Sequence, residues 1–140
     1  LSVNKAELAA HRAEDLIEVD VDGTTGWFPP EDIDALADPP EPPRVRLLPP
    51  GDPYLQTRDR KLIVPDAKAQ KVLWRILGNP GAVLVDGEIV AAWRAKAVGR
   101  RRLEFQLEPF DELPPDVGSE LDAEAQLIAT ARGISEATVG

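Results

Sequence analysis

The chain has 140 residues, and 25 acidic against 16 basic side chains give it a formal net charge of −9. At roughly 100–150 residues per domain, this length allows one domain or two very small ones. The chain contains no Cys and one His, which excludes disulfides, Cys-type zinc sites and His-rich metal sites. No apolar run approaches the roughly 18 residues that a membrane span requires, so we expect no membrane segment. Because the chain begins at Leu1 and contains no Met, we expect it to be part of a longer protein or a processed form.

The net charge is divided unevenly along the chain. Residues 1–43 carry 2 basic and 11 acidic side chains, residues 44–102 carry 13 and 5, and residues 103–140 carry 1 and 9. The three segments therefore have net charges of −9, +8 and −8. An acidic chain as a whole argues against nucleic-acid binding, but the field of a basic segment acts locally. The middle segment is therefore a candidate anion-binding surface.

The N-terminal part of the chain predicts a helix, a β-hairpin and a second short helix. Asn4 and Glu7 have the spacing of a capping box, so we expect a helix over residues 4–14. Residues 16–22 alternate between apolar and acidic side chains, as a half-buried strand does, and after an Asp-Gly turn residues 25–28 return as its partner. A Pro-Glu-Asp sequence then begins the short helix.

A proline-rich connector follows. Four of the seven residues 37–43 are Pro, so this segment is expected to be stiff and extended. We place the boundary between a unit of residues 1–36 and a unit of residues 44–140 at this connector.

The second unit predicts a small antiparallel sheet or partly closed barrel with two helices. We expect strands at residues 44–48, 83–85, 88–97 and 101–108, and helices at residues 65–77 and 116–132. Gly133 is expected to terminate the second of these helices. The first of these helices has an apolar stripe formed by Ala69, Val72, Leu73 and Ile76. The expected fold class is therefore α+β.

The strands at 88–97 and 101–108 allow a prediction of register. A three-residue loop at 98–100 places Arg94 opposite Glu104 and Lys96 opposite Arg102. We also expect Ile89, Ala91, Trp93 and Ala95 to share the inward face. The like-charge pair of Lys96 and Arg102 opposes pairing mildly, which is a weak indication that an anion binds there.

The residues needed for catalysis do not occur in a catalytic pattern. No Gly-rich phosphate loop is present, and Ser2, Ser119 and Ser135 do not lie in a nucleophile elbow. The adjacent carboxylate pairs are typical of helix caps and turns, and His11 is typical of a surface or packed residue. We expect no catalytic residue, no metal ligand and no cofactor in this chain.

The basic middle segment is the remaining indication of function. Its eleven candidate DNA-binding residues are Arg58, Arg60, Lys61, Lys68, Lys71, Arg75, Arg94, Lys96, Arg100, Arg101 and Arg102. Such clusters bind phosphate backbones through charge neutralisation and counterion release. Tyr54 and the three Trp residues could stack on bases, although Trp27, Trp74 and Trp93 fit a core better. The alternative is a solvated surface that the acidic flanks balance.

Two segments carry a resemblance to a known family. One is the Leu-Leu-Pro-Pro-Gly-Asp-Pro sequence at residues 47–53 with Asp59-Arg60 after it, and the other is the Val-Asp-Gly sequence at residues 85–87 with Trp93-Arg94 after it. Together they resemble the C-terminal region of the bacterial winged-helix DNA-binding family that includes the YcaQ and AlkZ DNA glycosylases. The order of elements across residues 4–28 also resembles the second half of a winged helix.

The resemblance implies a partial winged-helix unit followed by a terminal barrel-like domain, with further winged helices earlier in the full protein. It implies DNA as the partner, bound through its backbone with low sequence specificity, and a cytoplasmic or nucleoid location. The family's catalytic Gln-x-Gln or Gln-x-Asp motif belongs to the N-terminal winged helix, and residues 56–58 and 106–108 do not match it. The implied function is thus a non-catalytic C-terminal part of a DNA-repair protein whose full-length form resembles a glycosylase. A structural or protein-interaction domain, or part of a transcriptional regulator, is the alternative.

Overall fold

The computed structural model describes residues 16–21, 23–57 and 60–140. The chain forms two compact units, Leu1–Glu41 and Pro42–Gly140. The helix expected over residues 4–14 lies outside the described residues.

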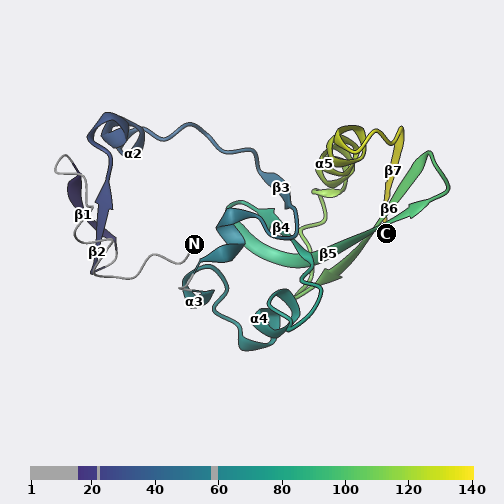
Figure 1. The fold of residues 1–140 in the computed structure, drawn as a ribbon, viewed down its shortest axis with the longest axis horizontal. Coiled ribbons are helices and arrows are strands. Elements are labelled where there is room, and N and C mark those ends of the chain that lie inside the picture. The colour runs from purple at the N-terminus through teal and green to yellow at the C-terminus, as the bar shows by residue number, and fades with distance from the viewer. Residues whose placement is uncertain (1–15, 22, 58–59) are drawn as a thin grey trace. The chain divides into compact units, whose positions relative to one another are not determined.

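The first unit contains a β-hairpin and a short helix. Strand β1 (Ile17–Val21) pairs antiparallel with β2 (Thr24–Phe28), and a 3₁₀ turn at Pro30–Asp32 continues into α2 (Ile33–Ala37) (Figure 1). The predicted hairpin and short helix are confirmed. None of the described residues of this unit is buried. The expectation of a core position for Trp27 is wrong, because the register sets Trp27 opposite Glu18 on the acidic face of the hairpin.

The second unit is built on one curled, five-stranded sheet. In the order of the sheet its strands are β3 (Val45–Leu48), β4 (Gly81–Val85), β5 (Glu88–Val98), β6 (Arg102–Pro109) and β7 (Glu136–Val139). The first four strands pair antiparallel, and β7 pairs parallel to β6 after the crossover helix α5 (Gly118–Ala131). The α+β class and the four antiparallel strands are confirmed, but the sequence reading missed β7. Because β3 and β7 are the edges, the sheet is open.

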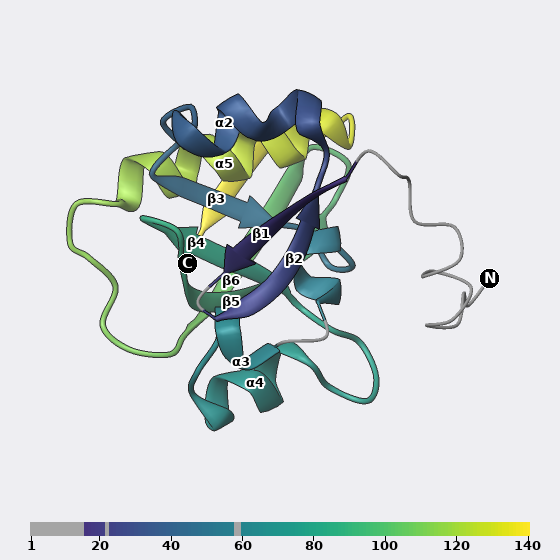
Figure 2. The ribbon, with the colours of Figure 1, turned by 90° about the vertical axis from the view of Figure 1, so that its left-hand side faces the viewer.

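Both faces of this sheet are covered, each by its own core (Figure 2). On one face, α5 packs through Leu121, Ala125 and Ala129 against Trp93 and Phe105, whose ring centroids lie 5.2 Å apart. The other face is covered by a 3₁₀ turn at Pro53–Gln56 and two short helices, α3 (Arg60–Ile63) and α4 (Ala67–Leu73). There Leu55, Val64, Ala69 and Leu73 pack on Ala82 and Ala92.

A bulge in β5 decides which side chains reach which core. Val83 pairs with Ala91 but Leu84 pairs with Ile89, which leaves Val90 as an extra residue in β5. The extra residue reverses the alternation, so Ile89 packs with the core under α4 while Ala91 packs with the core under α5. The expectation that Ile89 and Ala91 share a face is therefore wrong.

The helix expected at residues 65–77 is shorter than predicted. It begins after Asp66, whose carboxylate accepts a hydrogen bond from the backbone N–H of Ala69, and it ends at Leu73. Trp74 leaves the helical conformation, and its indole N–H donates to the carbonyl of Leu55 at 2.9 Å. Ile76 is consequently outside the helix and fully exposed, contrary to the predicted stripe. No helix in the described part of the chain is long and apolar enough to cross a membrane.

Candidate nucleic-acid interface

The β5–β6 hairpin carries the largest group of predicted basic residues. Its register places Arg94 opposite Gln106 and Lys96 opposite Glu104, while the loop consists of residues 99–101. The predicted register is thus wrong by two residues, because Gly99, with a φ of +65°, lies in the turn. Lys96 lies opposite Glu104, so the expected like-charge contact between Lys96 and Arg102 does not form. The indication of a bound anion that was drawn from that contact therefore does not hold.

Cross-strand partners share a face of the sheet, which fixes where the polar side chains of this hairpin lie. Ala92 belongs to the core under α4, so the residues in phase with it lie on the α4 side of the sheet. We call this group the ribbon face; it consists of Arg94, Lys96, Arg102, Glu104, Gln106 and Glu108. The opposite face of the same strands is apolar and packs against α5. The hairpin therefore presents its charged side chains on one side only.

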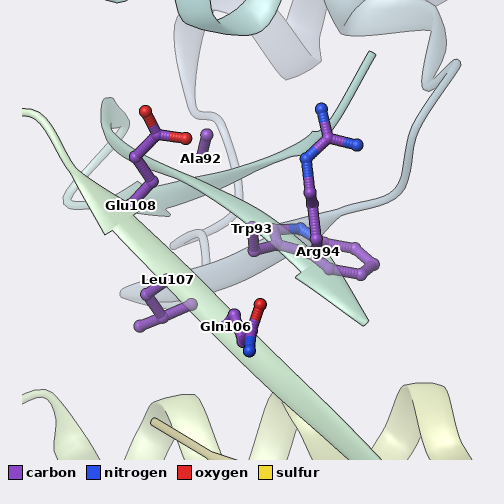
Figure 3. Close-up of a pocket in the computed structure, with 6 residues that line it drawn as sticks. All are labelled: Ala92, Trp93, Arg94, Gln106, Leu107 and Glu108. Atoms are coloured by element: carbon purple, nitrogen blue, oxygen red, sulfur yellow. The ribbon is translucent and has the colours of Figure 1, made fainter. Parts of the chain in front are cut away.

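Arg94 is fixed at the centre of this region. Its guanidinium donates a hydrogen bond of 2.7 Å to the carbonyl of Gly78, in the loop between α4 and β4. It lines a depression of about 210 Å³ with Gln106 and Glu108, and Figure 3 shows Arg94 and Glu108 on one side of the strands and Leu107 on the other. A second depression of about 220 Å³ lies between Arg94, Asn79 and Arg132. Both are smaller than the roughly 300–1,000 Å³ of a typical small-molecule site, so neither predicts a cofactor.

The basic residues around α4 lie on the same side of the sheet as the ribbon face. Lys68 and Lys71 are exposed on α4 itself. Arg75, expected on the helix, lies just beyond its end and forms an ion pair of 3.2 Å with Glu108. Arg60, expected in a loop, lies in α3 and stacks over the ring of Trp74 at 4.9 Å from the centroid.

The predicted cations fall into four groups. Arg75 and Arg102 are paired with carboxylates, Arg60 and Arg94 contact a ring or a carbonyl, and Arg58 lies outside the described residues. The remaining six form no ion pair with the part of the chain that the structure describes, and they are Lys61, Lys68, Lys71, Lys96, Arg100 and Arg101. All six are exposed.

Two further arginines of the basic segment, which the sequence reading did not select, are neutralised at the β3 edge. Arg44 binds both carboxylate oxygens of Asp116, at 2.9 and 3.0 Å, and lies 3.5 Å from Glu120. Arg46 pairs with Glu124 at 2.7 Å, and the same carboxylate accepts the backbone N–H of Leu47 at 3.1 Å. The spacing of Asp116, Glu120 and Glu124 in the sequence, four residues apart, is a pattern from which this pairing could have been found.

The contact between Arg44 and Asp116 also shifts the pKa values of both side chains. The hydrogen bond from Arg44 lowers the pKa of Asp116 below its ordinary value, with smaller lowering contributions from its own backbone and from the charge of Arg44. The hydrogen bond with Asp116 raises the pKa of Arg44 further above its ordinary range. Both side chains therefore stay charged across the neutral range. Nowhere in residues 16–21, 23–57 and 60–140 do three or more His, Cys, Asp or Glu side chains gather as a metal site would require.

Comparison with known proteins gave one family and one solved structure. The family model described as DNA glycosylase AlkZ-like matches residues 2–131. The chain is similar to the structure of the Streptomyces sahachiroi DNA glycosylase AlkZ, with a TM-score of 0.72 and 24% sequence identity. That match covers 99% of this chain and 37% of the AlkZ chain, so this chain spans little more than a third of that protein. At this identity the likeness shows a shared fold. A comparison with curated protein sequences gave no match.

Proposed function

Because the chain belongs to the DNA glycosylase AlkZ-like family, we propose that it is a non-catalytic C-terminal part of a winged-helix DNA-repair protein and that it supports binding to the DNA backbone. In this proposal residues 1–36 are the second half of a winged helix, residues 37–43 are the connector, and residues 44–140 are the terminal domain. Further winged helices of the full protein supply the catalytic residues, and the complex with DNA forms in the cytoplasm or nucleoid.

The low burial of the described residues of the first unit supports the winged-helix assignment. Among residues 16–21 and 23–41, which form a hairpin and a five-residue helix, none is buried, so these described residues contain no core of their own. A half domain that is completed by other parts of the protein accounts for this. The β1–β2 hairpin then corresponds to the wing.

The observation that carries DNA binding is the separation of charges in the second unit. The carboxylates of Asp116, Glu120 and Glu124 gather at the β3 edge, where they bind Arg44 and Arg46. The six unpaired cations lie elsewhere, around α3 and α4 and on the β5–β6 hairpin. A surface of this kind attracts phosphates even though the chain as a whole is acidic.

A salt titration tests the proposal with two variants that change the net charge equally. We expect the wild-type chain to bind a fluorescent duplex with an affinity that falls steeply with salt. Lys96→Gln removes an unpaired cation of the ribbon face and should reduce the slope of log affinity against log salt by about 0.9, the loss of one phosphate contact. Arg46→Gln removes a cation that is already paired with Glu124 and should leave the slope unchanged. Equal effects of the two variants, or no binding at about 50 mM salt, would contradict the proposal.

The alternative, a structural or protein-interaction domain, has its own supporting observation. Arg44, Arg46, Arg75 and Arg102 all pair with carboxylates from residues 103–140, as expected if the acidic C-terminal segment serves to neutralise the basic one. Absence of DNA binding in the titration would favour this alternative. A transcriptional regulator is distinguished by comparing two duplexes of equal length that share the same central base step but are otherwise unrelated in sequence, because a regulator would discriminate between them and a backbone-binding domain would not.

A further inference from the structure

The loop between α4 and β4 exposes two large aliphatic side chains at its tip. Ile76 is 101% exposed and Leu77 is 86% exposed, the two highest values among the exposed large hydrophobic residues of the described chain. Leu62 and Leu127, the next most exposed, lie singly on two different helices. A single exposed aliphatic residue is ordinary, whereas two adjacent ones that are this exposed indicate a binding surface.

This loop is held in a defined shape from both sides. Trp74, which precedes it, is fixed by the bond from its indole to the carbonyl of Leu55. Arg75 donates to the carbonyl of Val72 at 3.2 Å and pairs with Glu108, while Arg94 donates to the carbonyl of Gly78 at 2.7 Å. The two arginines tie the loop to the end of α4 and to the strands below it. The exposure of the tip is thus a property of an anchored loop.

The charges around the tip indicate the chemistry of its partner. Lys71 and Arg75 lie before it in the chain, and Arg94 is bonded to the residue that follows it. Among the described residues, Glu108 is the carboxylate bonded to these cations, and it is occupied by Arg75. An apolar tip flanked by cations matches proteins that insert aliphatic side chains between base steps while basic residues contact the flanking phosphates.

We propose that Ile76 and Leu77 form a wedge that inserts between adjacent base pairs of duplex DNA and partly unstacks them. This inference rests on the proposed function, since the wedge acts on the same DNA that the ribbon face and α4 bind. A pyrimidine–purine step is the preferred target, because such steps unstack more easily than others. Loss of base stacking on binding is the observable consequence.

The test measures affinity and base unstacking in one titration. The 140-residue chain is added to a duplex with a central TA step in which the adenine is replaced by fluorescent 2-aminopurine, and to a duplex of equal length with a central A-tract. We expect the fluorescence to rise on binding to the first duplex and the affinity to favour it by about threefold to tenfold. Ile76→Ser/Leu77→Ser should abolish both effects and keep the salt slope. Leu127→Ser removes an exposed aliphatic residue from α5 and should behave as the wild type.

The outcomes separate this inference from the proposed function. Salt-dependent binding without a rise in fluorescence overturns the wedge and leaves backbone binding intact. A rise that persists in the double variant also overturns the wedge, because another part of the chain then unstacks the bases. Absence of salt-dependent binding overturns both proposals.

Discussion

Glu104 is one of the two carboxylates that limit the positive charge of the ribbon face, and removing its charge should strengthen DNA binding. Its Oε1 lies 2.9 Å from the Nη2 of Arg102, and it sits opposite Lys96. Both side chains of the pair are nearly half exposed, at 45% and 42%. An exposed pair of this kind stabilises a fold by about 0–1 kcal/mol, so Glu104→Gln should fold normally.

The size of the effect follows from counterion release. Glu104→Gln frees Arg102 for a phosphate, and each added phosphate contact makes the slope of log affinity against log salt more negative by about 0.9. A fourfold change in salt, from about 50 to 200 mM, then reduces the affinity of the variant by about 3.5-fold more than that of the wild type. Fluorescence anisotropy with a short labelled duplex at four or five salt concentrations measures this difference.

A matched substitution controls for net charge. Glu120→Gln also removes one negative charge, but its carboxylate lies at the β3 edge, 3.5 Å from Arg44, which remains bound to Asp116. We expect the slope for this variant to equal that of the wild type. If both variants steepen the slope equally, net charge and not the ribbon face governs binding, and if Glu104→Gln leaves the slope unchanged, Arg102 does not contact phosphate.

Two further predictions concern the fold. Gly81→Ala would direct a Cβ into the Trp93 ring and into the Leu48 carbonyl, which accepts the Trp93 indole N–H at 2.9 Å. Overpacking and loss of this hydrogen bond should together lower the free energy of unfolding by about 2–6 kcal/mol. An unchanged urea midpoint would refute this packing. The carboxylate of Asp116 is held ionised by Arg44, so its contribution to stability is present above the ordinary pKa of 3.8 and is lost as the pH falls below that value. Urea midpoints of the wild type and Arg44→Gln should therefore differ at pH about 6, and this difference should narrow as the pH is lowered below 3.8; a gap that is independent of pH would contradict the pairing.

The elements that the sequence predicted well are those with a local cause. The hairpin at Asp86-Gly87 forms because this turn requires positive φ at both central residues, and the two residues have φ of +52° and +85°. The strand alternation in residues 16–22 and the stop of α5 at Gly133, with φ of +70°, are equally local. Such features depend on residues within a few positions of one another, which a single sequence displays directly.

The elements that it missed depend on distant partners. Strand β7 is four residues long and forms by parallel pairing with β6, about thirty residues earlier, where the backbone N–H of Glu136 also binds the carbonyl of Arg101. The early end of α4 depends on the bond from Trp74 to Leu55. The bulge at Val90 depends on the Phe110 N–H, which donates to the carbonyl of Val90. No pattern within these segments encodes contacts of this range.

The candidate site was predicted by residue type more reliably than by arrangement. The sequence placed the cations in one segment, but it could not show that Arg75 and Arg102 would be paired while Lys96 and Arg101 would form no ion pair with the described part of the chain. That distinction depends on the register of β5 and β6, where a shift of two residues exchanges Arg102 for Glu104 opposite Lys96. The electrostatic character of the ribbon face is therefore a tertiary property.

The acidic C-terminal segment has a structural role that makes a net charge of −9 compatible with the proposed binding to DNA. Glu124 accepts the backbone N–H of Leu47 on the edge strand β3 and pairs with Arg46, so it satisfies a backbone donor that an unprotected edge would leave available to another chain. Its charge, and those of Asp116 and Glu120, are thereby fixed at the β3 edge. In the proposed complex with DNA, the cations at this edge are occupied by carboxylates, whereas those on α4 and the β5–β6 hairpin form no ion pair with the described residues. The carboxylates at the β3 edge would then favour binding of a duplex on the α4 side of the second unit.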